Sequence, residues 1–407
     1  MVTRRRFLSA GLALPAASSL SPLASWAGGV WQPAELPAGA IAEGYLASLP
    51  GKLPLIKRSY RPPNYETPLE YFRAPITRND AFFVRYHLAG IPAVDAKTWR
   101  LKVGGDAAKA PIEFDLARLH KEFAPVELVA VCQCSGNRRG LFEPHVQGVE
   151  WGVGAMGNAS WKGVRLRDVL NKAGVDRKAL EVAFNGADGP AMQGTPDFVK
   201  SIPIERALDE NTLIAFEMNG KPIPHWNGFP ARLIVPGWTG TYWVKHLTDI
   251  DVRSTPLADF WMTPAYRIPA GKFPGVDRFP SQETAANQPI TDIVVNSLVT
   301  SLVDGQRVHL NQAVDVAGIA WDGGRGIRDV EVSTDGGHSW FLAELGKDFG
   351  RFSFRTFSHK FRPAEKGTAV VMVRAFNTRG DTQAPHLIFN PAGYHHNVVA
   401  HIKVEVV

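Results

Sequence analysis

Glycine and proline interrupt this chain so often that they restrict its possible folds more than any other feature. The chain has 38 glycines and 30 prolines among 407 residues, about one residue in six. Proline cannot donate a backbone hydrogen bond inside a helix, and glycine loses the most conformational freedom there, so both favour turns between short elements. A long-helix bundle or a coiled coil is therefore disfavoured, and we expect a fold rich in β-structure.

The length of 407 residues predicts at least two domains, because a single hydrophobic core stops growing at roughly 250 to 300 residues. Hydrophobic residues make up 45% of the chain and charged residues 21%, which is typical of a globular protein. These proportions argue against a disordered chain or a fibre.

Two regions of the chain differ in pattern. From residue 80 to about 250, short runs rich in Val and Ile alternate with helical stretches such as residues 165–173 and 204–208, which indicates a mixed α+β domain. The proline-rich segment 38–72 before it is expected to wrap irregularly over the surface. A linker rich in proline and glycine follows at residues 263–288.

The chain beyond residue 290 predicts a β-sandwich of about seven short strands separated by turns. Asp335-Gly336-Gly337 has the composition of a hairpin turn. The apolar runs lie at residues 293–295, 308–310, 314–316, 330–333, 354–357, 369–375 and 402–406. Tyr394-His395-His396 suggests a metal site, but adjacent histidines on a strand point to opposite faces, which favours a structural role.

The N-terminus has the three parts of an export signal. Three arginines at residues 4–6 precede an apolar stretch at 12–24, which ends in Ser25-Trp26-Ala27. Paired arginines followed by Phe-Leu resemble a twin-arginine signal. Pro15 and Pro22 interrupt the apolar stretch, which argues against a membrane anchor. We expect residues 1–30 to be a signal peptide and the mature chain to be periplasmic.

The charge balance argues against a nucleic-acid partner. The formal net charge is +6, and three of the 45 basic residues belong to the predicted leader, which holds no acid. The rest of the chain is nearly balanced and contains no run of four bases, whereas nucleic-acid binders carry a basic face. No later apolar stretch is long enough to span a membrane.

The two cysteines, Cys132 and Cys134, follow an apolar strand-like run and are separated by one residue. The Cα atoms of residues i and i+2 on a strand lie roughly 6.5 Å apart or more, at the edge of disulfide geometry. Cys132, inside the apolar run, is expected to be a buried thiol. Cys134 lies where the strand opens beside Arg138 and Arg139, which favour the metal-binding thiolate.

Several long motifs in a fixed order resemble the sulfite oxidase family of molybdenum enzymes, over nearly all of the chain beyond the leader. The resemblance implies a molybdopterin-binding catalytic domain at residues 38–287 and an immunoglobulin-like β-sandwich of dimerisation type at 288–407, an α+β fold overall. The motifs lie at residues 78–87, Gln133-Cys-Ser-Gly-Asn-Arg-Arg139, 157–166, 201–203, 227–232 and 236–245.

The resemblance implies a molybdenum cofactor (Mo-molybdopterin) with the Cys134 thiolate on the metal. Arg232 and Lys245 supply the charge-assisted donors that a buried phosphate requires. Asn227 departs from the histidine that many relatives carry there, so either Asn227 or nearby His225 contacts the pterin. The residues implied to hold the pterin and its phosphate are Phe83, Val84, Arg85, Tyr86, His87, Asp188, Asn227, Arg232, Trp243, Val244 and Lys245.

The family's substrate residues match four positions. Arg85 and Arg139 match its substrate arginines, which suit small anions such as sulfite and sulfate. Tyr266 matches a tyrosine of the family's pocket. The alternative is that Tyr266 is a core residue whose hydroxyl is already hydrogen-bonded. His87 lies two residues from Arg85 and faces the same way if the segment is extended, so it either orients the pocket or is structural.

The function implied by the resemblance is oxidation of sulfite to sulfate by a periplasmic sulfite dehydrogenase. The chain lacks a Cys-x-x-Cys-His motif, so we expect no haem on it and predict electron transfer to a separate c-type cytochrome, such as a tightly bound haem subunit. One alternative is a molybdenum-dependent reductase of oxidised sulfur compounds; the family's reductases usually lack Arg85 and the sandwich. Another is a non-catalytic exported β-sandwich binding protein, which would contain no molybdenum.

Overall fold

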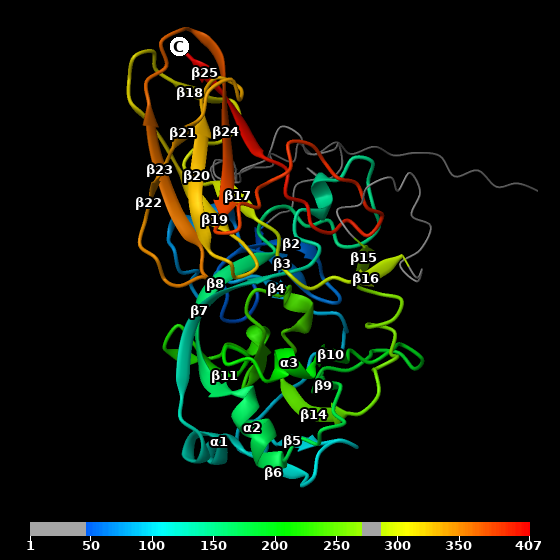
Figure 1. Cartoon of the computed structure of the whole chain (residues 1–407). Coiled ribbons are helices and arrows are strands. Elements are labelled where there is room, and N and C mark those ends of the chain that lie inside the picture. Colours follow the sequence, from blue (N-terminus) through cyan, green and yellow to red (C-terminus); the bar gives the residue numbers. More distant parts are fainter. Residues whose placement is uncertain (1–45, 271–285) are drawn as a thin grey trace, which may run out of the picture.

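The computed structural model describes residues 46–270 and 286–407. Figure 1 shows a blue-to-green N-terminal part and an upright β-sandwich of yellow-to-red strands beside one end of it. The predicted signal peptide and part of the predicted linker lie outside the described residues. Among the residues that are described, no helix combines the length and the apolar character that a bilayer span requires.

In its described residues, the N-terminal part contains three sheets of four or more strands and a few short helices. The strand orders are β1-β2-β3-β4, β10-β9-β14-β5-β6 and β12-β11-β8-β7, with β13 paired to β11. The first sheet consists of β1 (Leu46–Ala47), β2 (Leu55–Ser59), β3 (Asn64–Glu66) and β4 (Val84–Arg85). The second consists of β5 (Leu101–Gly104), β6 (Ile112–Phe114), β9 (Glu181–Gly186), β10 (Lys200–Pro203) and β14 (Leu247–Arg253). The third consists of β7 (Val126–Gln133), β8 (Met156–Arg165), β11 (Leu213–Met218), β12 (Lys221–Pro222) and β13 (Arg232–Ile234).

The helices of this part are short and pack against the sheets. They are α1 (Leu116–Glu122), α2 (Leu166–Ala173), α3 (Ile204–Ala207) and the 3-10 turns η1 (Leu69–Arg73), η2 (Arg139–Leu141), η3 (His225–Asn227) and η4 (Gly240–Tyr242). Helix α2 buries Leu166, Val169 and Leu170, which share one face at helical spacing, and ends at Gly174 in a left-handed conformation. The two predicted helical stretches therefore correspond to α2 and α3.

The segment before residue 72 differs from its prediction as an irregular surface wrap. It forms β1, β2 and β3, and β3 pairs with β4, so that Asn64 lies opposite Arg85. Leu55 and Phe72 are fully buried. The prolines lie at the turns of this sheet, and the apolar residues between them are buried in the core. The segment is therefore a structured part of the N-terminal part.

The C-terminal part is a sandwich of two sheets, with strand orders β17-β19-β23-β22 and β18-β25-β24-β20-β21. It has more strands than the seven predicted, because β21 and β22 are too short to give an apolar signal. Its strands are β17 (Asn296–Val299), β18 (Gln306–Val308), β19 (Val314–Trp321), β20 (Ile327–Ser333), β21 (Phe341–Leu342), β22 (Glu344–Leu345), β23 (Arg355–Phe361), β24 (Gly367–Asn377) and β25 (Ala400–Val406).

Two predictions about this part were wrong in detail. Residues 293–295 are not a strand; Ile293 N donates to Gly237 O and Asp292 bridges Trp238, so this stretch pairs with the N-terminal part, and the sandwich strand begins at Asn296. The histidines at 395 and 396 lie in a loop, and His395 has a φ of 56°, so alternation along a strand does not apply to them. The predicted boundary at 287/288 falls within β16 (Asn287–Pro289), which pairs with β15 (Arg267–Pro269).

A shared apolar core joins the two parts. Phe72, Val131 and Met156 of the N-terminal part pack with Leu298, Ile319, Trp321 and Phe354 of the sandwich. Val131 N also donates to Phe352 O. Strand β7, which ends at the cysteines, is therefore held by the sandwich as well as by its own sheet.

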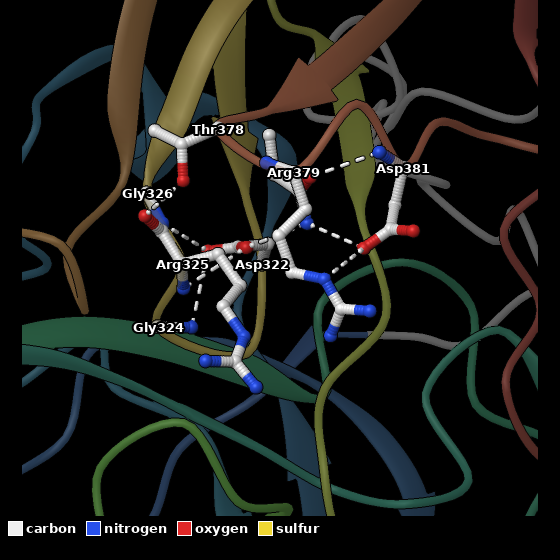
Figure 2. Close-up of polar contacts among 8 residues, drawn as sticks. Asp322, Gly324, Arg325, Gly326, Thr378, Arg379 and Asp381 are labelled. Atoms are coloured by element: carbon white, nitrogen blue, oxygen red, sulfur yellow. Dashed lines mark hydrogen bonds and ion pairs between the residues drawn. The ribbon is translucent and has the colours of Figure 1, made fainter.

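The long connection between β24 and β25 leaves the sandwich and reaches over the N-terminal part, as the red loops in Figure 1 show. Figure 2 shows how its first residues are fixed beside the turn that follows β19. Asp322 accepts backbone hydrogen bonds from Gly324, Arg325 and Gly326, and Thr378 Oγ1 donates to Arg325 O. The carboxylate and the turn thus tie the ends of β19 and β24 together.

Candidate active site

A pocket of about 620 Å³ opens where β4, the cysteine loop after β7 and the η4 segment meet. It gathers residues that are far apart in sequence and that were predicted to form one site. Those predicted residues that line it are Phe83, Arg85, Tyr86, His87, Cys134, Asp188, Asn227, Arg232, Trp243, Val244, Lys245 and Tyr266.

Two predicted residues do not line the pocket. Val84 is fully buried and packs with Leu55 and Tyr65, because alternate residues of β4 point to opposite faces. Arg139 lies beside the pocket and not in its wall: its Nε donates to Ala392 O at 3.1 Å and its Nη1 to Val149 O at 3.2 Å.

Some residues that line the pocket were not predicted to be site residues. Phe82, Phe198, Trp226 and Thr241 line the pocket, and so does Cys132. The sequence marked the segments that contain or adjoin most of them, so proximity to a motif was the available signal. Lys52 adjoins the site from a segment without such a motif, and Tyr394 adjoins it from the Tyr394-His395-His396 run, whose predicted role is structural.

The cysteine loop places Cys134 in the pocket wall through a dense set of backbone contacts. Cys134 N donates to Ala155 O, and Asn137 N donates back to Cys134 O. Before it, Gln133 Oε1 accepts from Trp321 Nε1 at 2.6 Å, and after it, the buried Arg138 donates to Ser297 O at 2.7 Å. Both cysteine thiols are free, and burial raises the pKa of Cys132 to about 11, which keeps that thiol neutral.

Arg85, His87 and Tyr266 form a connected group on another wall. Arg85 Nη1 donates to Asn64 Oδ1 at 3.2 Å and Nη2 to the Tyr266 hydroxyl at 3.5 Å, and that hydroxyl shares a hydrogen bond with His87 Nε2. The His87 ring stacks on Phe198 at 3.6 Å between centroids. Burial, followed by the charge of Arg85, holds the pKa of His87 well below its usual range, so the imidazole is neutral.

Arg232 and Lys245 also line the pocket, with little negative charge around them. Arg232 donates to Asn227 O at 2.8 Å and to Trp243 O at 3.0 Å, and its Nε has no acceptor within the described chain. Lys245 lies over the Tyr86 ring. Burial lowers the pKa of Lys245 well below its usual range, against the opposing effect of Asp188, and burial raises the pKa of Asp188.

These residues fit an anionic cofactor that carries a phosphate and a soft metal. Three cationic side chains line the pocket, and Asp188 is the one carboxylate among its described lining residues. Buried cations are costly unless a counter-charge accompanies them. A phosphate beside Arg232 Nε and Lys245 would supply that charge and would raise the pKa of Lys245 again. The Cys134 thiol presents the type of donor that soft metals prefer.

Asn227 is held by a lysine from the N-terminal sheet region. Lys52 is buried, and its Nζ donates to Asn227 Oδ1 at 2.6 Å, to Asn79 O at 2.6 Å and to Phe82 O at 3.0 Å. Asn227 Nδ2 in turn donates to Phe83 O at 3.1 Å. One hydrogen of Nδ2 therefore stays available to a ligand, while His225 is not among the residues that line the pocket.

Comparison with known protein families shows which kind of domain contains this site. Residues 87–261 match the oxidoreductase molybdopterin binding domain, and residues 287–407 match the Mo-co oxidoreductase dimerisation domain. The chain therefore carries the two domains of the molybdopterin oxidoreductase type, and the predicted fold class, a molybdopterin-binding domain followed by a β-sandwich, is confirmed. Strands are the more abundant element in it.

Relatives that match over most of this chain show the family. The chain is 36% identical over 366 residues to mitochondrial sulfite oxidase of Rattus norvegicus, a match that covers 86% of this chain and 65% of the relative. It is 34% identical to sulfite oxidase of Gallus gallus, covering 88% of this chain and 80% of that protein. The chain belongs to the sulfite oxidase family.

A solved structure shares the fold. The sulfane dehydrogenase SoxCD from Paracoccus pantotrophus matches with a TM-score of 0.73 and 23% identity, over 97% of both chains. The agreement extends through both domains.

Proposed function

We propose that this chain is the catalytic subunit of a periplasmic sulfite dehydrogenase, which oxidises sulfite to sulfate and passes electrons one at a time to a c-type cytochrome. The observation that carries the substrate assignment is the Arg85 group. A guanidinium, a hydroxyl and a neutral imidazole meet in the pocket that Cys134 also lines. A small oxyanion suits these donors, and the names of the relatives point to sulfite.

When bound, the molybdenum cofactor supplies the oxygen transfer and the two-electron redox chemistry. Cys134 would hold the metal, while Arg232 and Lys245 would hold the phosphate. Arg85 attracts the anion and holds it by charge-assisted hydrogen bonds. The Tyr266 hydroxyl oxygen accepts from Arg85 Nη2, and the hydroxyl shares one proton with the neutral His87 Nε2, so these two contacts together fix the orientation of the hydroxyl in the pocket.

The proposed acceptor and location depend on the sequence. A chain without a Cys-x-x-Cys-His motif has no c-type haem attachment, so a separate cytochrome would receive the electrons. The arginines at residues 4–6 and the apolar stretch after them support export to the periplasm. Membership of an oxidoreductase family disfavours the non-catalytic binding protein, and Arg85 together with the sandwich favours oxidation over the reductase alternative.

The test is a sulfite-dependent assay on purified, molybdenum-loaded protein with cytochrome c and, separately, with ferricyanide as acceptor. We expect both acceptors to be reduced when sulfite is added. Reduction of ferricyanide alone would contradict the cytochrome assignment. No reduction of either acceptor by a protein with full molybdenum and pterin content would contradict the substrate assignment.

A further inference from the structure

The loop between β24 and β25 carries its tip into the neighbourhood of the active site. Asn390, Ala392 and Tyr394 at this tip are buried, although the loop belongs to the sandwich in sequence. Tyr394 packs in a core cluster with Leu88, Phe198 and Tyr266 of the N-terminal part. The sandwich therefore contributes side chains next to the pocket wall.

Internal hydrogen bonds hold the tip rigid. Asn390 Nδ2 donates to Tyr394 O at 2.7 Å, and Tyr394 N donates to Asn390 Oδ1 at 3.1 Å. Gly393, with a φ of 62°, makes the turn between them. Nearer the sandwich, Gln383 accepts from Ser297 Oγ at 2.7 Å and donates to Val398 O at 3.2 Å, which ties the two stems of the loop.

The tip closes around Arg139. The guanidinium carbon of Arg139 lies 5.2 Å from the centroid of the Tyr394 ring, and Arg139 Nε donates to Ala392 O. A Cβ on Gly136 would stand 2.6 Å from the guanidinium nitrogens, so the lack of a side chain at Gly136 leaves room for the guanidinium where it lies. The sandwich supplies part of the enclosure around Arg139.

The same ring supports the pocket tyrosine. Tyr394 stacks on Tyr266 at 5.8 Å between centroids and 12° between planes. Tyr266 has a φ of 59°, which a bulky side chain adopts only when its surroundings hold it there. Burial raises the pKa of the Tyr394 hydroxyl, so the ring stays neutral beside the arginine. Tyr394 thus contacts both Arg139 and a residue that lines the pocket.

We infer that Tyr394, presented by the Asn390-clamped tip of the sandwich loop, is a positioning residue for the anion site and fixes Arg139 and Tyr266 through the face of its ring. The inference rests on the proposed function, since it takes the anion to be sulfite or sulfate. Its consequence is that the sandwich domain takes part in recognition of the substrate.

Variants of the full-length, molybdenum-loaded chain test this role. Tyr394→Ala should raise the KM for sulfite by about 3- to 10-fold, the effect of losing a cation–π contact and a stacked partner, with a smaller effect on kcat. The inhibition constant of sulfate should rise in parallel. Tyr394→Phe keeps the ring and should stay within about twofold of wild type. Molybdenum and pterin content should be unchanged in both.

Two further variants separate positioning from a general loss of structure. Phe389→Ala removes another ring of the same loop, which contacts Phe142 and not Arg139, and should leave KM unchanged. Asn390→Ala keeps Tyr394 but frees the tip, and should raise KM in the same direction as Tyr394→Ala. Asn390→Ala decides the question if Tyr394→Ala cannot be isolated with its metal.

The inference is wrong if Tyr394→Ala and Asn390→Ala both keep the wild-type KM and sulfate affinity. It is also wrong if Tyr394→Phe is impaired as much as Tyr394→Ala, because the hydroxyl would then carry the effect. Calorimetry of sulfate binding to each variant distinguishes a failure of the Tyr394 inference from a failure of the proposed function. A wild-type protein that binds sulfate without oxidising sulfite would overturn the proposed function, while the order of sulfate affinities would still test Tyr394.

Discussion

Cys132 and Cys134 both reach the pocket, but their surroundings give them different chemistry. Cys132 is buried, and Arg232 Nη2 approaches its sulfur at 3.9 Å, whereas Cys134 lies in the loop that the sandwich holds on both sides. Cys134→Ser should abolish turnover, because a hydroxyl is a harder and less covalent donor to a soft metal. Cys132→Ala should cost only packing, about 1 kcal/mol. Sulfite turnover, metal content and chemical denaturation measure these effects, and equal loss of activity in two folded, metal-loaded variants would contradict a single protein ligand.

Arg85 and Arg139 should differ in their effect on the substrate, since only Arg85 lines the pocket. Arg85→Gln should lower kcat/KM for sulfite by roughly 30- to 1000-fold, mostly through KM, as expected for a charge-assisted contact worth about 2 to 4 kcal/mol. Arg139→Gln should lower it by about 3- to 10-fold, because its charge acts from behind the wall. Steady-state kinetics decide the order, and an Arg85→Gln enzyme with full molybdenum content and unchanged kcat/KM would show that the anion binds elsewhere.

Strand β10 begins with a buried lysine whose charge depends on pH. Lys200 Nζ donates to Trp261 O at 2.6 Å and lies over the rings of Tyr242 and Tyr266. Burial, with a smaller effect of Arg267, lowers the pKa of Lys200 to about 7 from its usual 10.5. The unfolded chain therefore binds more protons between these two values, and the free energy of unfolding contributed by Lys200 rises as the pH increases from about 7 to about 10.

Lys200→Met should remove this contribution. Urea denaturation at pH 7, 8.5 and 10 should show the stability of wild type increasing relative to that of Lys200→Met as the pH rises. The exposed Lys97 provides the matched control, and Lys97→Met should follow wild type at every pH. A constant difference between wild type and Lys200→Met across this range would contradict the lowered pKa.

The shared core between the two domains should make them unfold together. Leu298 is fully buried in that core, and Leu298→Ala should destabilise the protein by about 2 to 5 kcal/mol through loss of contacts and the cavity that remains. Because the core belongs to both domains, we expect one transition in denaturant for wild type and variant alike. Two separate transitions, with only the second shifted by the substitution, would show that the domains are energetically independent.

The proposed periplasmic location depends on the N-terminal signal of the precursor. Arg4→Lys together with Arg5→Lys should retain the precursor in the cytoplasm, because recognition of a twin-arginine signal depends on the guanidinium groups and not on charge alone. Cell fractionation followed by detection of the chain measures this. Continued export of folded, molybdenum-loaded protein would contradict the proposed signal.

Local sequence patterns determined the outline of this protein. Short apolar runs separated by turns predicted most of the sandwich strands, and the helical stretches at residues 165–173 and 204–208 predicted α2 and α3, because these signals depend on neighbours along the chain. The motifs at residues 78–87, 133–139, 227–232 and 236–245 contain most of the residues that line the pocket. The prediction of a sandwich strand at residues 293–295 was wrong because their apolar character fits a strand of either domain. Only the packing of the two domains determined which residues they pair with.

The tertiary structure alone decided how the site is supported. Lys52 holds Asn227 across 175 residues, and Ala392 holds Arg139 across 253 residues. Neither contact can be predicted from the local sequence, because a lysine between two strands or a carbonyl in a loop can pair with any group that folding brings near. The tertiary structure also decided that Arg139 lies behind the pocket wall and that Tyr394 stacks on Tyr266. Both placements depend on a loop of the sandwich packing against the other domain. That packing is determined by how the two cores fit together, and no local pattern in a single sequence contains this geometry.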